Sequence, residues 1–194
     1  MRWTLGLVVA MLTLGVPLLY ANKRAKVVRA LRVVEEGVLY RSGQLSRDGL
    51  NRVVVEYGIK TVVSLRYAEG DRTLPPDAAE EEWCRERGIR YVRIRPREWS
   101  SATGEAPAEV GVQQFLGVMD DPANHPVLIH CYAGVHRTGA HCAIYRMEYQ
   151  GWRPENALKE MVWVGYDHLD TEPDVREYLS AYRPRSVSQE LNGQ

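Results

Sequence analysis

The sequence predicts an α/β domain: a central, mostly parallel sheet of about four to five strands, flanked by helices. Two observations favour this class. Short β-branched or apolar runs alternate with helical patterns along most of the chain, which is typical of a parallel sheet covered by helices. One of these runs, residues 126–130 (PVLIH), is apolar almost throughout, as expected for a central strand buried on both faces.

The first half of the predicted domain opens with a hairpin and then alternates. β-Branched and aromatic residues flank the turn Glu35-Glu36-Gly37, which indicates two short antiparallel strands. Ser46 is suited to begin a helix, and Gly58 to end it. The expected elements are strands at 32–34 and 38–41, a helix from 46 to 57, a strand at 61–65, a helix over 77–88 and a strand at 89–94.

The second half is mainly helical. Residues 95–105 are expected to form a loop, and Pro107 to begin a helix. Gly151 and Pro154 separate two later helices, and Gly165 ends the second of them. The expected elements are a helix from 107 to 119, the strand at 126–130, and three closing helices over 138–149, 154–164 and 171–182.

The amino-terminal segment differs from the rest of the chain. Residues 3–21 carry no charge, and as a helix they would reach about 28 Å, close to the thickness of a bilayer core. Five basic residues follow within residues 23–32, so the positive-inside rule favours a membrane anchor with the remaining chain in the cytoplasm. The alternative is a cleaved signal peptide and an exported protein. We therefore expect an anchor or signal at 1–22, a basic linker at 23–31, one domain at 32–184 and a flexible tail at 185–194.

Composition excludes several function classes. Basic and acidic residues number 25 each, so the net charge gives no reason to expect a nucleic-acid partner. Three cysteines without paired spacing argue against a disulfide framework, and the histidines lack a metal-ligand spacing. We expect a monomer without a bound metal.

The stretch VLIHCYAGVHRTGAHCAIYRM, residues 127–147, joins the central strand to a helix. Cys131 follows the strand, Arg137 comes six positions later, and Thr138 and Gly139 open the helix. A loop of this length can turn its backbone N–H groups inward at a helix N-terminus, which binds anions. Gly134 and Gly139 permit the close backbone approach. These surroundings stabilise a thiolate, and Arg137 can grip two phosphate oxygens, so the turn suits attack of sulfur on phosphorus.

The pattern His130-Cys131-x5-Arg137-Thr138-Gly139 resembles the signature of the cysteine-dependent protein tyrosine phosphatases. The similarity is greatest to the atypical dual-specificity group of bacteria, plants and fungi. Three further stretches resemble that group: GVLYRSGQLS and GIKTVVSLR before the signature, and GWRPENALKEM after it. The resemblance covers about residues 32–182.

The resemblance implies a role for each residue of the turn. Cys131 would be the nucleophile and form a phosphocysteine intermediate, and Arg137 would bind the phosphoryl group. Thr138 would help the thiolate leave, and His130 would order the loop and lower the thiol pKa. The family needs no metal and no organic cofactor. The phosphate would be held by the backbone N–H groups of Tyr132, Ala133, Gly134, Val135, His136 and Arg137.

The sequence offers two candidates for the general acid, the residue that protonates the leaving group. The family takes an aspartate from a loop about thirty residues before the cysteine, but no aspartate lies between Asp77 and Asp120. Glu98, 33 residues upstream of the cysteine, is the favoured candidate, and Glu105, 26 upstream, is the second. The third alternative is that no residue serves, in which case good leaving groups would be preferred.

The substrate class follows from the loop. Tyr132, Ala133 and Val135 replace the lysines of inositide-directed relatives, so a phosphorylated protein, carrying phosphotyrosine or phosphoserine/threonine, is the first choice. The HRTG stretch occurs in the inositol-pyrophosphate group, so a small phosphorylated metabolite is the second. A non-catalytic phosphate-binding module is the third.

Four other residues have open interpretations. Cys84 and Cys142 are expected to pack in the core, and the alternative is a regulatory disulfide from one of them to Cys131. His136 contacts the substrate at the rim or is merely solvated, and Arg41 braces the loop or forms a surface ion pair.

Overall fold

The computed structural model describes residues 28–67 and 74–186, together with the isolated positions 13 and 15. Its centre is a five-stranded sheet in the order β1-β2-β5-β3-β4. β1 pairs antiparallel with β2, and the remaining neighbours are parallel. The predicted sheet is therefore confirmed, including the central position of the apolar strand. The strands are β1 (Arg32–Glu35), β2 (Leu39–Ser42), β3 (Thr61–Ser64), β4 (Arg90–Arg93) and β5 (Val127–His130).

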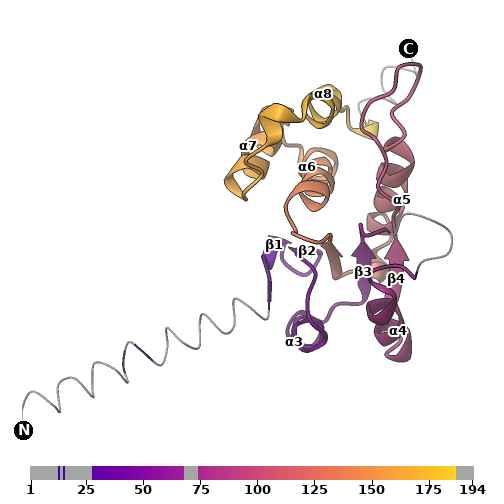
Figure 1. The fold of residues 1–194 in the computed structure, drawn as a ribbon, viewed down its shortest axis with the longest axis vertical. Coiled ribbons are helices and arrows are strands. Elements are labelled where there is room, and N and C mark those ends of the chain that lie inside the picture. The colour runs from indigo at the N-terminus through magenta and orange to yellow at the C-terminus, as the bar shows by residue number, and fades with distance from the viewer. Residues whose placement is uncertain (1–12, 14, 16–27, 68–73, 187–194) are drawn as a thin grey trace, which may run out of the picture.

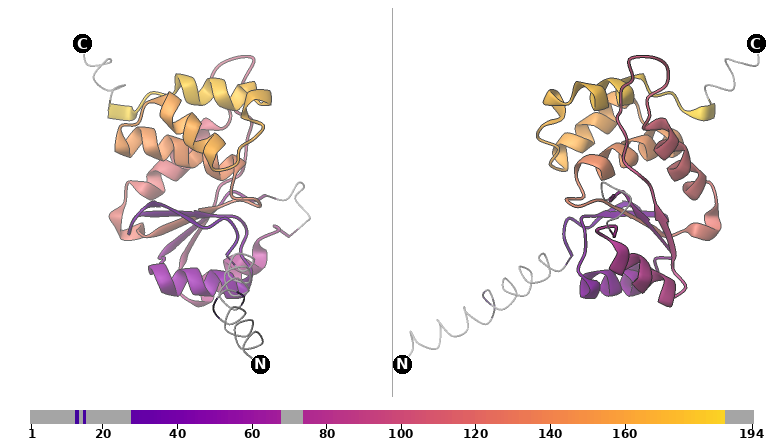
Figure 2. Two further views of the ribbon diagram at one scale, coloured as in Figure 1. Left: turned by 90° about the vertical axis from the view of Figure 1, so that its left-hand side faces the viewer. Right: turned by 45° about the vertical axis from the view of Figure 1, so that its right-hand side comes forward.

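Helices cover both faces of the sheet, which makes three layers (Figure 1, Figure 2). One face carries α3 (Arg47–Tyr57) and α4 (Ala78–Glu86). The other carries α5 (Glu109–Met119), α6 (His136–Gln150), α7 (Pro154–Trp163) and α8 (Pro173–Ala181). Two short 3-10 turns, η2 (Pro122–Asn124) and η3 (Leu169–Thr171), lie between these elements.

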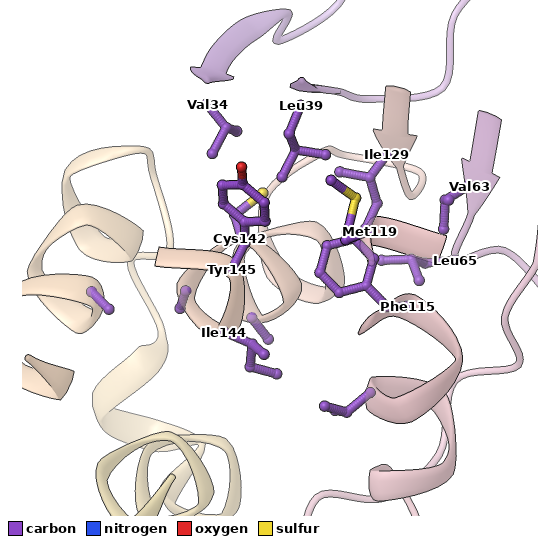
Figure 3. Packing of buried hydrophobic residues seen from close by; sticks show 14 of the residues in the cluster. Val34, Leu39, Val63, Leu65, Phe115, Met119, Ile129, Cys142, Ile144 and Tyr145 are labelled. Carbon is purple, nitrogen blue, oxygen red and sulfur yellow. The ribbon is translucent and has the colours of Figure 1, made fainter. Parts of the chain in front are cut away.

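Successive side chains along the buried strands point to opposite faces of the sheet, so each layer of helices packs on an apolar surface. Val62 and Leu128 face α3 and α4, where they pack with Leu50 and Trp83. Their neighbours Val63 and Ile129 face the larger cluster under α5 and α6, which Figure 3 shows with Leu39, Phe115 and Ile144. Strands buried on both faces are thus fixed in register, since a slip of one residue would exchange the two surfaces. This register sets the position of every residue at the carboxyl ends of the strands.

The helix ends agree with the expected caps in most places. The Ser46 hydroxyl accepts a hydrogen bond from the Gly49 backbone N–H at 3.1 Å, and Gly58 ends the same helix in the left-handed conformation. The last helix begins at Pro173 rather than at Thr171, because the preceding residues form η3 and proline is favoured at a first helical position. α5 likewise begins two residues later than predicted, at Glu109.

Residues just outside both predicted boundaries of the domain make contacts with the folded part. Val28 and Leu31, which we assigned to the linker, pack against the cluster under α3 and α4. Arg185, which we assigned to the tail, donates hydrogen bonds to Asp120 at 2.8 Å and to Glu148 at 2.6 Å. The folded part therefore extends beyond residues 32–184 at both ends.

The predicted anchor or signal segment, residues 3–21, falls almost wholly outside the residues that the structure describes. Within 28–67 and 74–186, no helix has the length and apolar character needed to cross a bilayer. The amino-terminal expectation stays a prediction.

Candidate active site

The parallel pairing of β5 with β2 and β3 brings the candidate residues to the carboxyl-terminal edge of the sheet. The β5 strand ends at His130, opposite Ser42 of β2 and Ser64 of β3, and Cys131 comes next in the chain. The following turn leads directly into α6, which begins at His136. The cysteine side chain is 4% exposed. A thiol thus lies at the floor of the strand-to-helix turn, at the sheet edge where α/β proteins bind ligands.

Gly134 folds the loop back over the thiol. Its backbone N–H donates to Cys131 Sγ at 3.2 Å, and its φ is +77°. A Cβ at this position would lie 2.5 Å from Gly43 N and from the Ser42 carbonyl carbon, so a side chain does not fit. A Cβ at Gly139 would meet its nearest neighbours only at 3.6–3.7 Å, an ordinary contact. The close approach therefore requires glycine at 134 but not at 139.

The thiol is surrounded by hydrogen-bond donors. Burial alone would raise the pKa of Cys131. The Thr138 hydroxyl and the backbone N–H groups of Thr138, Gly134 and Val135 outweigh that burial, and they hold the pKa below its usual value. The other two thiols behave oppositely, because burial raises the pKa of Cys84 to about 12 and also raises that of Cys142. All three cysteines are free and buried, so the expectation that Cys84 and Cys142 pack in the core is confirmed.

Arg137 and Thr138 lie in the first turn of α6. The Thr138 side chain is fully buried beneath the loop, where its hydroxyl is close enough to lower the pKa of the thiol but has no aligned hydrogen-bond partner. The Arg137 side chain is exposed, and its only hydrogen bond among the described residues is a long one from Nη1 to the Leu65 carbonyl, at 3.4 Å. Its remaining guanidinium donors are therefore available for a ligand above the loop.

His130 and Arg41 support the loop from below. The His130 ring is 1% exposed, with Nδ1 3.4 Å from the Cys131 carbonyl oxygen and Nε2 3.2 Å from Glu80 Oε1. The second separation is an electrostatic contact rather than an aligned hydrogen bond, since Nε2 has no hydrogen-bond partner. Arg41 is 3% exposed, and its Nη2 donates to the Gly134 carbonyl at 2.8 Å. Of the two interpretations of Arg41, the structure favours the loop brace.

A cavity of about 280 Å³ opens beside Arg137. Glu98 lines it, and the Glu98 backbone carbonyl accepts from the Ala108 N–H at 2.9 Å, which ties this loop to the start of α5. Glu105 lies in a separate surface hollow together with Glu109. The structure therefore brings Glu98 to the side of the arginine and leaves Glu105 apart. The lining residues are Leu65, Ile94, Arg95, Pro96, Arg97, Glu98, Trp99, Ala108, Gly111, Arg137 and His141.

Trp99 and His141 are the residues of this cavity that the sequence analysis missed. The Trp99 ring packs edge-on against His141 at 5.9 Å and against Tyr178 at 5.0 Å. His141 Nδ1 lies 2.9 Å from the Arg137 carbonyl oxygen, and burial lowers the His141 pKa to about 4, so the ring is neutral. His141 lies four residues after Arg137, in the predicted helix that follows it, and this spacing was the signal in the sequence that could have placed it near Arg137.

His136 is exposed at the start of α6, and its ring stacks on Tyr166 at 4.4 Å with an interplanar angle of 22°. A contact of this ring with the substrate stays a prediction. Within the described part of the chain, no group of histidine, cysteine and acidic side chains is arranged to hold a metal ion.

A buried thiol at a strand-to-helix turn, with an arginine at the start of the following helix, is the arrangement typical of cysteine-based phosphatases on an α/β sandwich. A family model described as "DSP-PTPase phosphatase fused to NAD+ Kinase" matches residues 22–174. The chain belongs to this family of dual-specificity-like phosphatases.

Two similar proteins are named for different substrates. The dual specificity protein phosphatase TpbA of Pseudomonas aeruginosa is 43% identical over 54 residues, which cover 28% of this chain and 25% of TpbA. The inositol diphosphatase DSP4 of Arabidopsis thaliana is 33% identical over 110 residues, which cover 50% of this chain and 55% of DSP4. The matched residues thus cover about a quarter of TpbA and about half of DSP4. They cover only 10% of a rice protein named Probable NAD kinase 2, chloroplastic.

Solved structures share the fold. The catalytic domain of the Saccharomyces cerevisiae PP-IP phosphatase SIW14 superposes with a TM-score of 0.63 at 19% identity, covering 86% of this chain and 93% of that one. P. aeruginosa TpbA superposes with a TM-score of 0.62 at 24% identity, covering 84% of this chain and 91% of that one.

Proposed function

We propose that this chain hydrolyses phosphate monoesters on proteins, phosphotyrosine first, through a phosphocysteine intermediate. The observation that carries the proposal is the position of the Cys131 thiol: it is buried at the end of β5, it accepts a hydrogen bond from the Gly134 N–H at 3.2 Å, and Arg137 follows in the first turn of α6. The donors around the thiol also hold its pKa below the usual value although the side chain is buried, which is typical of a nucleophile rather than of core packing.

The reaction would proceed in two displacements. The Cys131 sulfur attacks phosphorus, and the bond from phosphorus to the substrate oxygen breaks as Glu98 gives that oxygen its proton. Water then attacks the phosphocysteine, Glu98 takes the proton of that water, and the sulfur leaves as a thiolate that the Thr138 hydroxyl stabilises. Arg137 and the loop N–H groups bind the phosphoryl oxygens in both transition states. The products are inorganic phosphate and the free hydroxyl group.

The cavity beside Arg137 supports a phosphorylated side chain as the substrate. Leu65, Ile94 and Trp99 give it an apolar wall that suits an aromatic ring next to the phosphate. TpbA, which has been solved with phosphotyrosine, shares the fold. The second candidate is an inositol pyrophosphate, which the names of DSP4 and SIW14 suggest and which the exposed cations Arg95 and Arg97 in the same cavity would favour.

Turnover and trapping of the intermediate test the proposal. We expect the 194-residue chain to release phosphate from a phosphotyrosine peptide faster than from an inositol pyrophosphate. Acid quenching during turnover, followed by mass spectrometry, should find one added phosphate on the peptide containing Cys131. Binding of the peptide without phosphate release would establish the non-catalytic module instead, and faster release from the inositol pyrophosphate would establish the second candidate.

The general acid is tested by substitution. The wild-type rate should rise with pH as Cys131 ionises, below the usual range of a thiol because its pKa is lowered. Glu98→Gln cannot donate a proton, so we expect kcat for the phosphotyrosine peptide to fall about 100-fold. Glu105→Gln, the matched control in the separate hollow, should keep the wild-type kcat. A kcat of Glu98→Gln within a few-fold of the wild type would remove Glu98 from the mechanism.

A further inference from the structure

Two arginines flank the tyrosine that follows Cys131. The Tyr132 side chain is 60% exposed at the rim of the loop. The guanidinium carbon of Arg29 lies 4.7 Å from the centre of its ring, and that of Arg66 lies 5.3 Å from the same point. Arginines over an aromatic ring are held by cation–π attraction without losing their positive charge. The residue next to the candidate nucleophile thus carries two fixed cations.

The backbone holds these side chains together. The Arg29 carbonyl accepts from the Gly43 N–H at 2.9 Å, and the Tyr132 carbonyl accepts from the Gln44 N–H at 3.0 Å. Arg66 follows Leu65, whose carbonyl accepts from Arg137. Three segments far apart in the sequence therefore meet at one side of the loop, and the cluster is part of the folded domain.

Neither arginine is neutralised within 28–67 and 74–186. Among the described residues, Arg29 contacts the Tyr132 ring and backbone groups, and the Arg66 guanidinium donates only to the neutral amide oxygen Gln44 Oε1, at 3.0 Å. The buried acid Glu80 accepts from Gln44 Nε2 at 2.5 Å and lies 3.2 Å from His130 Nε2, and within the described residues it forms no ion pair with Arg29 or Arg66. Two arginines without a carboxylate beside a phosphate loop attract a second anion.

We propose that Arg29 and Arg66 form a second anion-binding subsite, which receives an acidic side chain next to the phosphorylated residue of a protein substrate. This inference rests on the proposed function and adds a sequence preference to it. Arg29 precedes the sheet, so the segment at residues 28–31 would take part in choosing the substrate.

The test compares two phosphotyrosine peptides that differ only in flanking residues, glutamate in one and glutamine in the other. For the wild type we expect kcat/KM to be about fivefold higher for the glutamate peptide at low salt, since exposed ion pairs contribute modestly. The ratio should approach one in Arg29→Gln/Arg66→Gln, and also in the wild type at high ionic strength.

The control is Arg87→Gln, because Arg87 also lies over an aromatic ring, that of Trp83 at 4.2 Å, but directly after the end of α4. Its ratio should equal that of the wild type. A wild-type ratio of one, or a ratio unchanged in the double variant, would overturn the subsite. Peptide dissociation constants measured on Cys131→Ser give the same comparison without turnover, so the subsite is tested even if the proposed function fails.

Discussion

Replacing Cys131 by serine should lower kcat for a phosphotyrosine peptide by about 10⁴-fold or more, because removal of a nucleophile leaves only binding and orientation. The loop N–H groups and the Thr138 hydroxyl lower the pKa of the thiol below its usual value. A serine hydroxyl is a far weaker acid, so the same donors cannot ionise it at neutral pH. The peptide should still bind, since Arg137 and the loop backbone remain.

Cys142→Ser provides the matched control for this loss. Cys142 is fully buried in α6, and burial raises its pKa, so it has no place in the chemistry and its replacement should leave kcat within a few-fold of the wild type. Alkylation by iodoacetamide near pH 7 should label Cys131 and spare Cys84, whose pKa is about 12. Equal activity in Cys131→Ser and the wild type, or equal labelling of the three thiols, would remove Cys131 as the nucleophile.

The elements that the sequence predicted well are those with a strong local signal. The PVLIH run could only be a buried strand, and β-branched residues at 61–64 marked its neighbour. Ser46 and Gly58 fixed one helix at both ends. Cys131 and Arg137 were recognisable because a strand and a helix meet between them, and the geometry of that junction is local. Such features can be predicted from the sequence because each depends on residues within one turn or one strand.

The contacts that support the site could not be read in this way. Arg41 reaches Gly134 across 93 positions, and the backbones of Gly43 and Gly134 pack together only because β2 and β5 are neighbours. The contact of Arg29 with Tyr132 depends on the same strand order. Sequence spacing carries no information on these pairings until the order of the strands is known.

Replacing Arg137 by lysine should lower kcat for a phosphotyrosine peptide by about 1,000-fold. Arginine offers a planar fork that binds two oxygens at once, whereas lysine is a point charge that cannot reproduce both bonds. An arginine that stabilises a transferring phosphoryl group is worth about 10³- to 10⁵-fold in kcat. The peptide dissociation constant should change much less, because the charge is kept and the loss falls mainly on the transition state.

The fold should tolerate this change. The Arg137 side chain is exposed, and the one hydrogen bond that it makes to a described residue, the Leu65 carbonyl, is long at 3.4 Å. We therefore expect the melting temperature of Arg137→Lys to stay within about 2 °C of the wild type, as for most exposed substitutions. Arg87→Lys, at an exposed arginine far from the loop, should change neither kcat nor stability. A loss of kcat below tenfold in Arg137→Lys would show that the guanidinium fork is not what stabilises the phosphoryl group, and that the loop N–H groups and the helix N-terminus suffice.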